Sequence, residues 1–297
     1  MSSLIRRLRL KKVLVSDGAW GTFLQAKGLK PGECPELWNL DRPLDVLNIA
    51  ESYIHAGSDV IETNSFGGSS ITLERFGLKD HAFEINKAAA MISRKAAGPE
   101  HLVMGSIGPS GKILMTEEIS PDELYEAFRE QALALEEGGA DVIVIETMTD
   151  LQEALIALKA VKENTRLETI CTMTFDRTVS GEFRTMMGVS PEEMTKELAG
   201  AGADMIGTNC GHGMNDMEGI VKEIRKTNDR IPVIVQGNAG VPEYRNGQTV
   251  YPLSPDEFAG CILPLLAAGA SVVGGCCGTL PEHISKIRKV VDGRIAS

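Results

Sequence analysis

Aromatic residues and positive charge are both scarce in this sequence. Aromatic residues make up 5% of the 297 positions, so aliphatic side chains and alanine must fill the core. The formal net charge is -11 and no basic patch is visible, which excludes nucleic acid as an expected partner. No apolar run approaches the ~18 residues of a membrane span. No signal-type segment precedes the first predicted strand, so we expect a cytoplasmic protein with no membrane partner.

Disulfides are also not expected. The chain has six cysteines, at positions 34, 171, 210, 261, 276 and 277. In a reducing compartment such cysteines do not form a disulfide framework. The adjacent pair Cys276 and Cys277 is in any case poorly suited to a disulfide. Thiolate chemistry is therefore the more informative question, and Cys34 is expected to be structural or incidental.

Linkers and nucleotide-binding motifs are absent too. No Gly-x-Gly-x-x-Gly motif follows the first predicted strand, so a dinucleotide site is not supported. No linker rich in proline, glycine or serine divides the chain, and we expect residues 1–297 to form one domain. The basic cluster RRLRLKK near the start indicates that residues 1–11 are a solvated N-terminal extension.

One phrase recurs along the chain. It reads HAGSDVIET at 55–63, EGGADVIVIET at 137–147, AGADMIGTN at 201–209 and AAGASVVGG at 267–275. Each copy is a helix end closed by glycine, followed by a buried strand. With the gaps filled, eight strands are expected near Val13, Asp59, Leu102, Asp141, Thr169, Met205, Ile231 and Ser271. Eight alternating units at this length predict an α/β fold, a single (β/α)8 TIM-type barrel, and an open doubly wound sheet is the alternative.

Three cysteines follow two of these predicted strands, where reactive residues of such barrels gather. Cys210 ends the sixth strand, and Cys276 and Cys277 end the eighth, roughly 10 Å away between backbones. Three thiolates with an open fourth position are typical of catalytic zinc. The alternative, that the cysteines are small buried hydrophobes, suits Cys171 and Cys261 but not two adjacent thiols in a glycine-flanked turn.

Six motifs carry a family resemblance that covers nearly the whole chain. In this order DGAWGT, ETNSFG, GSIGPSG, TNCG, NAG and GGCCGT resemble the homocysteine S-methyltransferase family. The likeness is greatest to the homocysteine-binding module of cobalamin-dependent methionine synthases. It implies a zinc-dependent transferase that methylates the thiol of homocysteine to give methionine, with the substrate sulfur as fourth ligand. Family members often have proline where this chain has Gly237.

The fourth position on zinc needs an occupant when homocysteine is absent. Water is one candidate. Asn238 is another, because it ends the seventh strand between the two cysteine-bearing strands. The alternative is that Asn238 only hydrogen-bonds its loop. His212, two residues after Cys210, is expected to be a loop or supporting residue and not a ligand.

The amino-acid end of homocysteine carries an ammonium and a carboxylate. Asp17 and Glu146 lie at strand ends, match the family, and are expected to bind the ammonium; the alternative is that they brace loops. Backbone N–H groups at Gly18-Ala19 or Gly105-Ser106 are expected to meet the carboxylate. Asn209 is expected to support the metal ligands. Weaker substrate-binding candidates are Ser106, Thr63 and Asn64.

The methyl donor is expected to approach a face that carries Trp20, Trp38 and Phe66. These aromatics could hold a cationic small molecule or dock another protein. The likeness to the cobalamin-linked branch favours a separate, methylated corrinoid protein as donor and partner. Betaine, S-methylmethionine and S-adenosylmethionine are the alternative donors, and another thiol in a corrinoid demethylation pathway is an alternative acceptor. A non-catalytic barrel subunit with structural zinc is the remote alternative.

Overall fold

The computed structural model describes residues 3–211, 213–245 and 248–296. Eight parallel strands form its central sheet in the order β1-β12-β9-β8-β5-β4-β3-β2, and a bridge between Ser16 and Val60 joins the two outer strands. The sheet is therefore a nearly closed barrel, and the predicted fold class is confirmed. The strands are β1 (Leu14–Val15), β2 (Val60–Glu62), β3 (Leu102–Ile107), β4 (Val142–Met148), β5 (Glu168–Met173), β8 (Met205–Cys210), β9 (Val233–Gly237) and β12 (Val272–Gly275).

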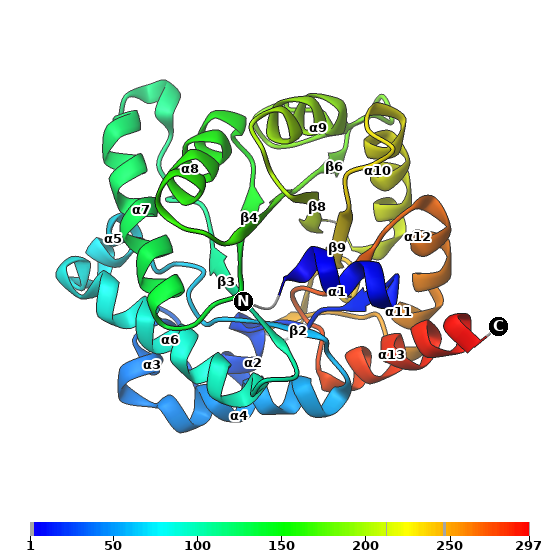
Figure 1. Cartoon of the computed structure of the whole chain (residues 1–297), viewed down its shortest axis with the longest axis horizontal. Coiled ribbons are helices and arrows are strands. Elements are labelled where there is room, and N and C mark those ends of the chain that lie inside the picture. The colour runs from blue at the N-terminus through cyan, green and yellow to red at the C-terminus, as the bar shows by residue number, and fades with distance from the viewer. Residues whose placement is uncertain (1–2, 212, 246–247, 297) are drawn as a thin grey trace.

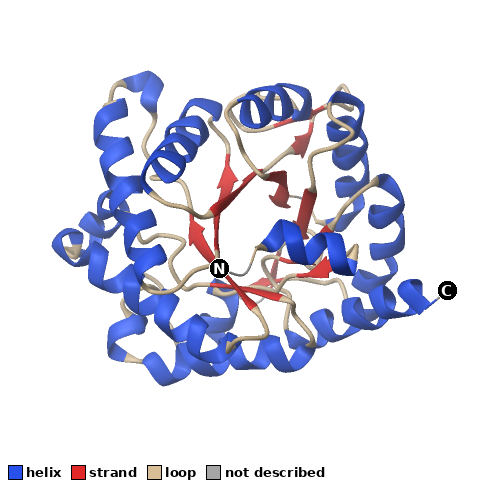
Figure 2. Ribbon diagram, in the orientation of Figure 1, coloured by secondary structure: helices blue, strands red, loops and turns tan. Residues whose placement is uncertain are grey.

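Helices surround this ring of strands (Figure 2). Within the described residues, no helix is both long enough and apolar enough to cross a membrane. The helices are α1 (Leu4–Lys11), α2 (Gly21–Ala26), α3 (Trp38–Asp41), α4 (Pro43–Ala56), α5 (Ser70–Leu73), α6 (Ala82–Ala97), α7 (Pro121–Glu137), α8 (Leu151–Asn164), α9 (Pro191–Gly200), α10 (Met214–Thr227), α11 (Pro255–Gly260), α12 (Ile262–Ala268) and α13 (Pro281–Ala296), with 3₁₀ turns at Glu74–Phe76, Lys79–His81 and Leu114–Thr116.

Local signals in the sequence start and stop these helices. Ser120, Ser190 and Ser254 each cap a helix through a reciprocal pair of hydrogen bonds with the glutamate three residues on, and proline follows each serine. Gly57 and Gly269 end α4 and α12 in the left-handed conformation, at φ 103° and 114°. The predicted start of every barrel strand lies within two residues of the observed one.

Two small hairpins were not predicted. They are β6 (Asp176–Arg177) with β7 (Phe183–Arg184), and β10 (Glu243–Arg245) with β11 (Gln248–Val250). Both project from loops that follow barrel strands, β5 and β9 respectively. Their short, polar sequences lack the apolar periodicity that identifies a buried strand. They enlarge the face of the barrel on which the strands end.

Helix α1 lies across the amino end of the barrel (Figure 1). Leu4 and Leu8 are 1% and 9% exposed and pack into the barrel interior with residues such as Leu14 and Leu102. The backbone N–H of Ile5 donates to Glu168 on β5 at 3.2 Å. The expected solvated extension is therefore wrong for the apolar side of this helix, because burial of the two leucines closes one end of the core.

Candidate metal and substrate site

A cavity of about 280 Å³ opens at the carboxyl ends of the barrel strands. It brings together residues from the carboxyl ends of seven barrel strands and from the loops that follow them, as expected for this fold. The lining comprises Gly18, Ala19, Trp20, Gly21, Pro35, Glu36, Glu62, Thr63, Asn64, Ser65, Phe66, Ser106, Glu146, Thr147, Asn209, Cys210, Gln236, Gly275, Cys276 and Cys277. Most of the residues expected from the sequence to form the site therefore line one cavity.

The three strand-end cysteines meet at one edge of this cavity. The Sγ atoms of Cys210, Cys276 and Cys277 all lie within 4.8 Å of one another, and the Cys276 and Cys277 sulfurs are 4.0 Å apart. Tetrahedral zinc with ~2.3 Å bonds to sulfur needs sulfurs about 3.8 Å apart. Cys210 has a left-handed backbone, φ 64°, where the chain turns out of β8. The three thiols fit a metal ion after small adjustments.

Protons are shared unequally among these thiols. Cys210 accepts hydrogen bonds from Cys276 and Cys277, which lowers the pKa of Cys210 to about 3. The same bonds to Cys210 raise the pKa of Cys276 well above its usual range and that of Cys277 to about 11. The hydroxyl of Tyr251, a residue that the sequence analysis did not identify, also hydrogen-bonds Cys277. Only a nearby cation would let all three thiols ionise together.

Asn238 lies beside this cluster with a free oxygen. Its Nδ2 donates to the carbonyl of Gly211 at 2.8 Å and lies 3.7 Å from the Cys210 sulfur. Its Oδ1 is buried and has no hydrogen-bond partner within the part of the chain that the structure describes. An amide oxygen left without a donor is costly unless something else satisfies it, and a metal ion would do so.

Gly237, the residue before Asn238, has no room for a side chain, since an added Cβ would lie 2.3 Å from the sulfur of Met214.

Glu146 is a buried acid on the opposite side of the cavity from β12. Its Oε1 accepts from the Ser106 hydroxyl at 2.5 Å, and its Oε2 accepts from Asn209 Nδ2 at 3.2 Å. Burial is the main cause that raises the pKa of Glu146 to about 7. Asn209 also accepts from the Thr147 N–H at 2.9 Å. Ser106 and Asn209 thus hold Glu146 in place, and Asn209 links it to the strand of Cys210.

Asp17 lies behind the cavity wall and does not line it. It is fully buried; its Oδ2 accepts from the Trp20 indole at 2.9 Å and from the Glu62 N–H at 2.8 Å. Its Oδ1 has no partner. Burial raises the pKa of Asp17 to about 7. Asp17 therefore orients Trp20 and Glu62, both of which do line the cavity.

Glu62 and Gln236 are cavity residues that the sequence analysis missed. Gln236 Nε2 donates to Glu62 Oε1 at 2.7 Å, so a side chain of β9 meets one of β2 across the barrel. Burial, followed by the charges of Glu146 and Asp17, raises the pKa of Glu62 well above its usual range. The available signal was the repeat itself, since ETN at 62–64 parallels ETM at 146–148.

Several expected substrate contacts are already used within the protein. The Ala19 N–H donates to the Thr279 hydroxyl at 3.1 Å and the Ser106 N–H to the Thr63 hydroxyl at 3.0 Å. The Asn64 amide donates to the Pro35 carbonyl at 2.8 Å. The N–H groups of Ala19 and Ser106, one from each turn expected to bind the carboxylate, are thus not free, because neighbouring loops already bond them. Gly18, Thr63 and Asn64 do line the cavity.

The three aromatics expected on the donor face separate in the structure. Trp20 and Phe66 line the cavity, and Phe66 is 43% exposed at its mouth. Trp38 does not line it: its ring is buried in the core, with the Arg42 guanidinium 3.7 Å from the ring centroid. The donor-face assignment of Trp38 is therefore wrong, because α3 turns the indole inward. His212 lies outside the described residues.

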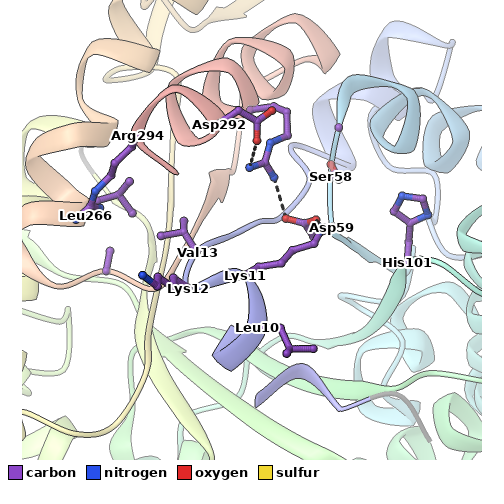
Figure 3. A pocket seen from close by; sticks show the side chains of 13 residues that line it. Leu10, Lys11, Lys12, Val13, Ser58, Asp59, His101, Leu266, Asp292 and Arg294 are labelled. Carbon is purple, nitrogen blue, oxygen red and sulfur yellow. Dashed lines mark hydrogen bonds and ion pairs between the residues drawn. The ribbon is translucent and has the colours of Figure 1, made fainter. Parts of the chain in front are cut away.

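A larger cavity, about 980 Å³, lies far from the cysteines at the amino end of the barrel (Figure 3). Four of its charged side chains pair with one another: Asp59 binds Lys11 at 2.5 Å and Arg288 at 3.0 Å, and Arg288 also binds Asp292 at 2.6 Å. These pairs join α1, β2 and α13. They explain these four charges as structural contacts.

The fold and the cysteine cluster define a (β/α)8 barrel with a candidate thiolate metal centre at its carboxyl end. Residues 14–291 match the family model described as homocysteine S-methyltransferase, and the chain belongs to that family. It is 32% identical over 295 residues to methionine synthases of Mycobacterium leprae and Mycobacterium tuberculosis. The match covers 95% of this chain but only 24% and 25% of those proteins, so the chain spans about a quarter of their length.

Solved structures show the same fold. The homocysteine methyltransferase MmuM from Escherichia coli, in its metallated form, superposes with a TM-score of 0.80 at 21% identity, covering 96% of this chain and 99% of that one. The apo form of the same enzyme gives a TM-score of 0.72 at 21% identity, covering 94% and 95%. At this identity the likeness concerns the barrel alone.

Proposed function

We propose that residues 1–297 form a zinc-dependent homocysteine-binding domain that transfers a methyl group to the homocysteine sulfur and yields methionine. One observation carries this proposal: three thiols that could hold a metal face a cavity rich in acids, in a chain of the homocysteine S-methyltransferase family. The chemistry of the thiols and the unpartnered Asn238 oxygen fit zinc. We also infer a cytoplasmic location, because all six thiols are free and suit a reducing compartment.

Each residue of the site would have a separate role that follows from its position. Cys210, Cys276 and Cys277 would hold the metal, which when bound would keep the substrate sulfur ionised and nucleophilic. Asn238 would hold the fourth position until homocysteine arrives. Glu146, aligned by Ser106 and Asn209, would bind the ammonium of the substrate, and Asp17 would support this site from behind. The two ends of homocysteine would thereby be fixed across the barrel mouth.

For the donor we propose a methylated corrinoid protein, supported by the face that surrounds the cavity. Ten of the fifteen large apolar side chains exposed in the described residues lie in loops between a barrel strand and the helix that follows it. Exposed apolar surface is a feature of protein contacts, so these side chains favour a protein donor over a small polar one. They are Phe66, Ile113, Met115, Val179, Met186, Met187, Val241, Tyr244, Val250 and Leu280, which we call the mouth surface.

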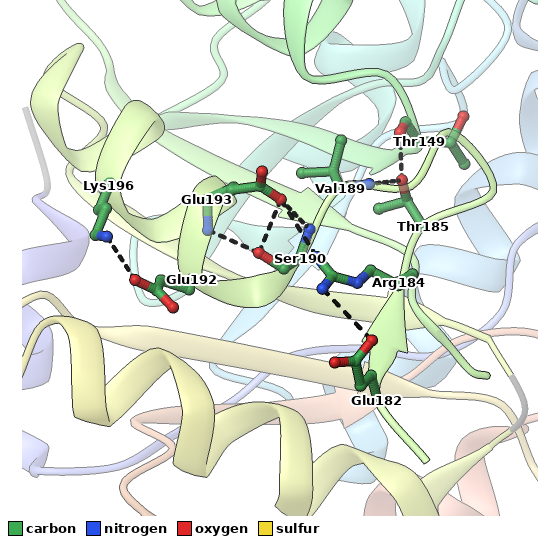
Figure 4. A network of polar contacts seen from close by, with 9 residues as sticks. All are labelled: Thr149, Glu182, Arg184, Thr185, Val189, Ser190, Glu192, Glu193 and Lys196. Carbon is green, nitrogen blue, oxygen red and sulfur yellow. Dashed lines mark hydrogen bonds and ion pairs between the residues drawn. The ribbon is translucent and has the colours of Figure 1, made fainter. Parts of the chain in front are cut away.

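Part of the mouth surface is held by a polar network (Figure 4). Arg184 lies 3.5 Å from both Glu182 and Glu193, joining β7 to the start of α9. The Thr185 hydroxyl donates to the carbonyl of Thr149 at 2.7 Å, just beyond β4. These contacts fix the ends of the loop that exposes Met186. A fixed loop offers an apolar contact at low entropic cost to a partner.

The test is a methyl-transfer assay of the zinc-loaded protein with homocysteine. Methylcobalamin, a methylated corrinoid protein, betaine, S-methylmethionine and S-adenosylmethionine would be supplied in turn. We expect methionine with the corrinoid donors and little with the other three. Methionine from betaine, or from either sulfonium donor alone, would overturn the proposed donor, and no methionine from any of them would overturn the proposed reaction.

A further inference from the structure

The charge around the cavity is one-sided. Among the described residues that line it, three are glutamates and none is a lysine, arginine or histidine. Glu36, Glu62 and Glu146 are 4%, 8% and 6% exposed, so water solvates none of them well. Buried acids without a positive partner are costly, and a cationic ligand would relieve that cost.

These three acids differ in how the protein satisfies them. Glu36 is bonded at both oxygens, to the Gly67 N–H at 2.7 Å and to the Cys34 thiol at 3.4 Å. Glu146 is also bonded at both, to Ser106 and Asn209. Among the described residues, Glu62 has one side-chain hydrogen bond, from Gln236 to Oε1, which leaves its other oxygen for a ligand.

Acceptors without donors collect around Glu62. The Oε1 of Gln236 is buried and has no partner, and the same is true of Oδ1 of Asp17, whose other oxygen holds the Glu62 N–H. Gln236 and Asp17 are 2% and 0% exposed. A buried polar atom normally has a hydrogen-bond partner, so this region lacks N–H donors. An ammonium group brings three N–H donors and a positive charge.

We propose that Glu62, held by Gln236, is a specificity-determining residue that binds the α-ammonium of the acceptor thiol together with Glu146. The proposal rests on the function proposed above and adds to it a reason for choosing amino-acid thiols. The Gln236 bond fixes the carboxylate of Glu62 from across the barrel. A thiol without an ammonium would leave the second carboxylate oxygen of Glu62 without a donor, and the cavity would bind that thiol less tightly than homocysteine.

The experiment compares homocysteine with 4-mercaptobutyrate, which is homocysteine without its ammonium. Binding of each thiol to the zinc-loaded protein would be measured by calorimetry for wild type and Glu62→Gln. We expect Glu62→Gln to weaken homocysteine binding 10-fold or more, since bonds to charged groups carry that much. Binding of 4-mercaptobutyrate should stay within 2-fold of wild type or become tighter. Zinc content should be unchanged.

Two further variants separate specificity from damage to the fold. Glu153→Gln removes a buried acid outside the cavity, bonded to the Ser110 N–H at 2.7 Å, and should leave both affinities unchanged. The double exchange Glu62→Gln with Gln236→Glu keeps one charge and the cross-barrel bond, and should restore part of the preference for homocysteine. Equal weakening of both thiols in Glu62→Gln, or homocysteine affinity within 2-fold of wild type, would overturn the proposal. If wild type binds neither thiol, the proposed function itself fails.

Discussion

At the scale of single residues, the candidate site concentrates features that a stable core avoids. Cys210 and Thr147 have positive φ, 64° and 60°, although neither is glycine. Asp17, Gln236 and Asn238 each leave a buried oxygen unpartnered. Such strain and unpaired acceptors persist where ligand binding compensates them. These features are consistent with the proposed binding of a metal and a substrate, which would offset their cost to the free protein.

Cys276→Ala should abolish stable zinc binding and methyl transfer together, because two thiolates and one amide oxygen make a much weaker site than three thiolates. Cys261→Ala is the matched control, since that cysteine lies at the junction of α11 and α12 and is not part of the cluster. The zinc content of each variant would be measured by mass spectrometry after dialysis. A Cys276→Ala protein that keeps one zinc would refute the ligand assignment.

Glu146→Gln should change how stability depends on pH. Burial raises the pKa of Glu146 to about 7, so the folded protein holds a proton there that the unfolded chain releases near pH 4.5. The contribution of Glu146 to the free energy of unfolding is therefore lost as pH rises from 4.5 to about 7. The loss amounts to at most about 3 kcal/mol. The variant has no such loss. The free energies of unfolding of the variant and of zinc-free wild type would be measured with urea at pH 5 and pH 8. The value for the variant minus that for wild type should rise by about 2–3 kcal/mol between these pH values. A difference that does not change with pH would contradict this prediction.

At the scale of elements, α1 contributes to the barrel in a way its basic sequence conceals. Leu4→Ala should lower the free energy of unfolding by about 2–3 kcal/mol, the usual cost of truncating a buried leucine. Leu10→Ala in the same helix is the control, because Leu10 is 78% exposed and should change stability by less than about 0.5 kcal/mol. Equal effects in urea unfolding would show that α1 does not close the core.

The sequence predicted elements well where one local signal was enough. Serine-proline caps and closing glycines gave the helix ends, apolar runs after a closing glycine gave four of the barrel strands, and filling the gaps between them gave the other four. The strand-end rule then brought Cys210 and the Cys276-Cys277 pair together. Glu62 was missed because its importance comes from a contact with Gln236 across the barrel, which no local pattern records. Trp38 was misplaced because the direction of a short helix in a loop is set by packing.

At the scale of the whole molecule, the apolar side chains of the mouth surface and the cysteine cluster lie at the same end of the barrel. Met186→Glu should lower kcat/KM about 10-fold with a methylated corrinoid protein and leave it unchanged with free methylcobalamin, because only the protein donor needs the surface. Met91→Glu is the control: it is 56% exposed but lies on α6. A loss with both donors would mean that Met186 affects the cavity and not docking.

We propose above that three thiolates of this barrel hold zinc and leave its fourth position to the sulfur of homocysteine. X-ray absorption at the zinc edge tests it directly, by counting sulfur neighbours without and with homocysteine. The account predicts three sulfurs and one lighter atom in the free protein, and four sulfurs once homocysteine is added. An unchanged count on adding homocysteine, or four protein ligands that homocysteine does not displace, would contradict it.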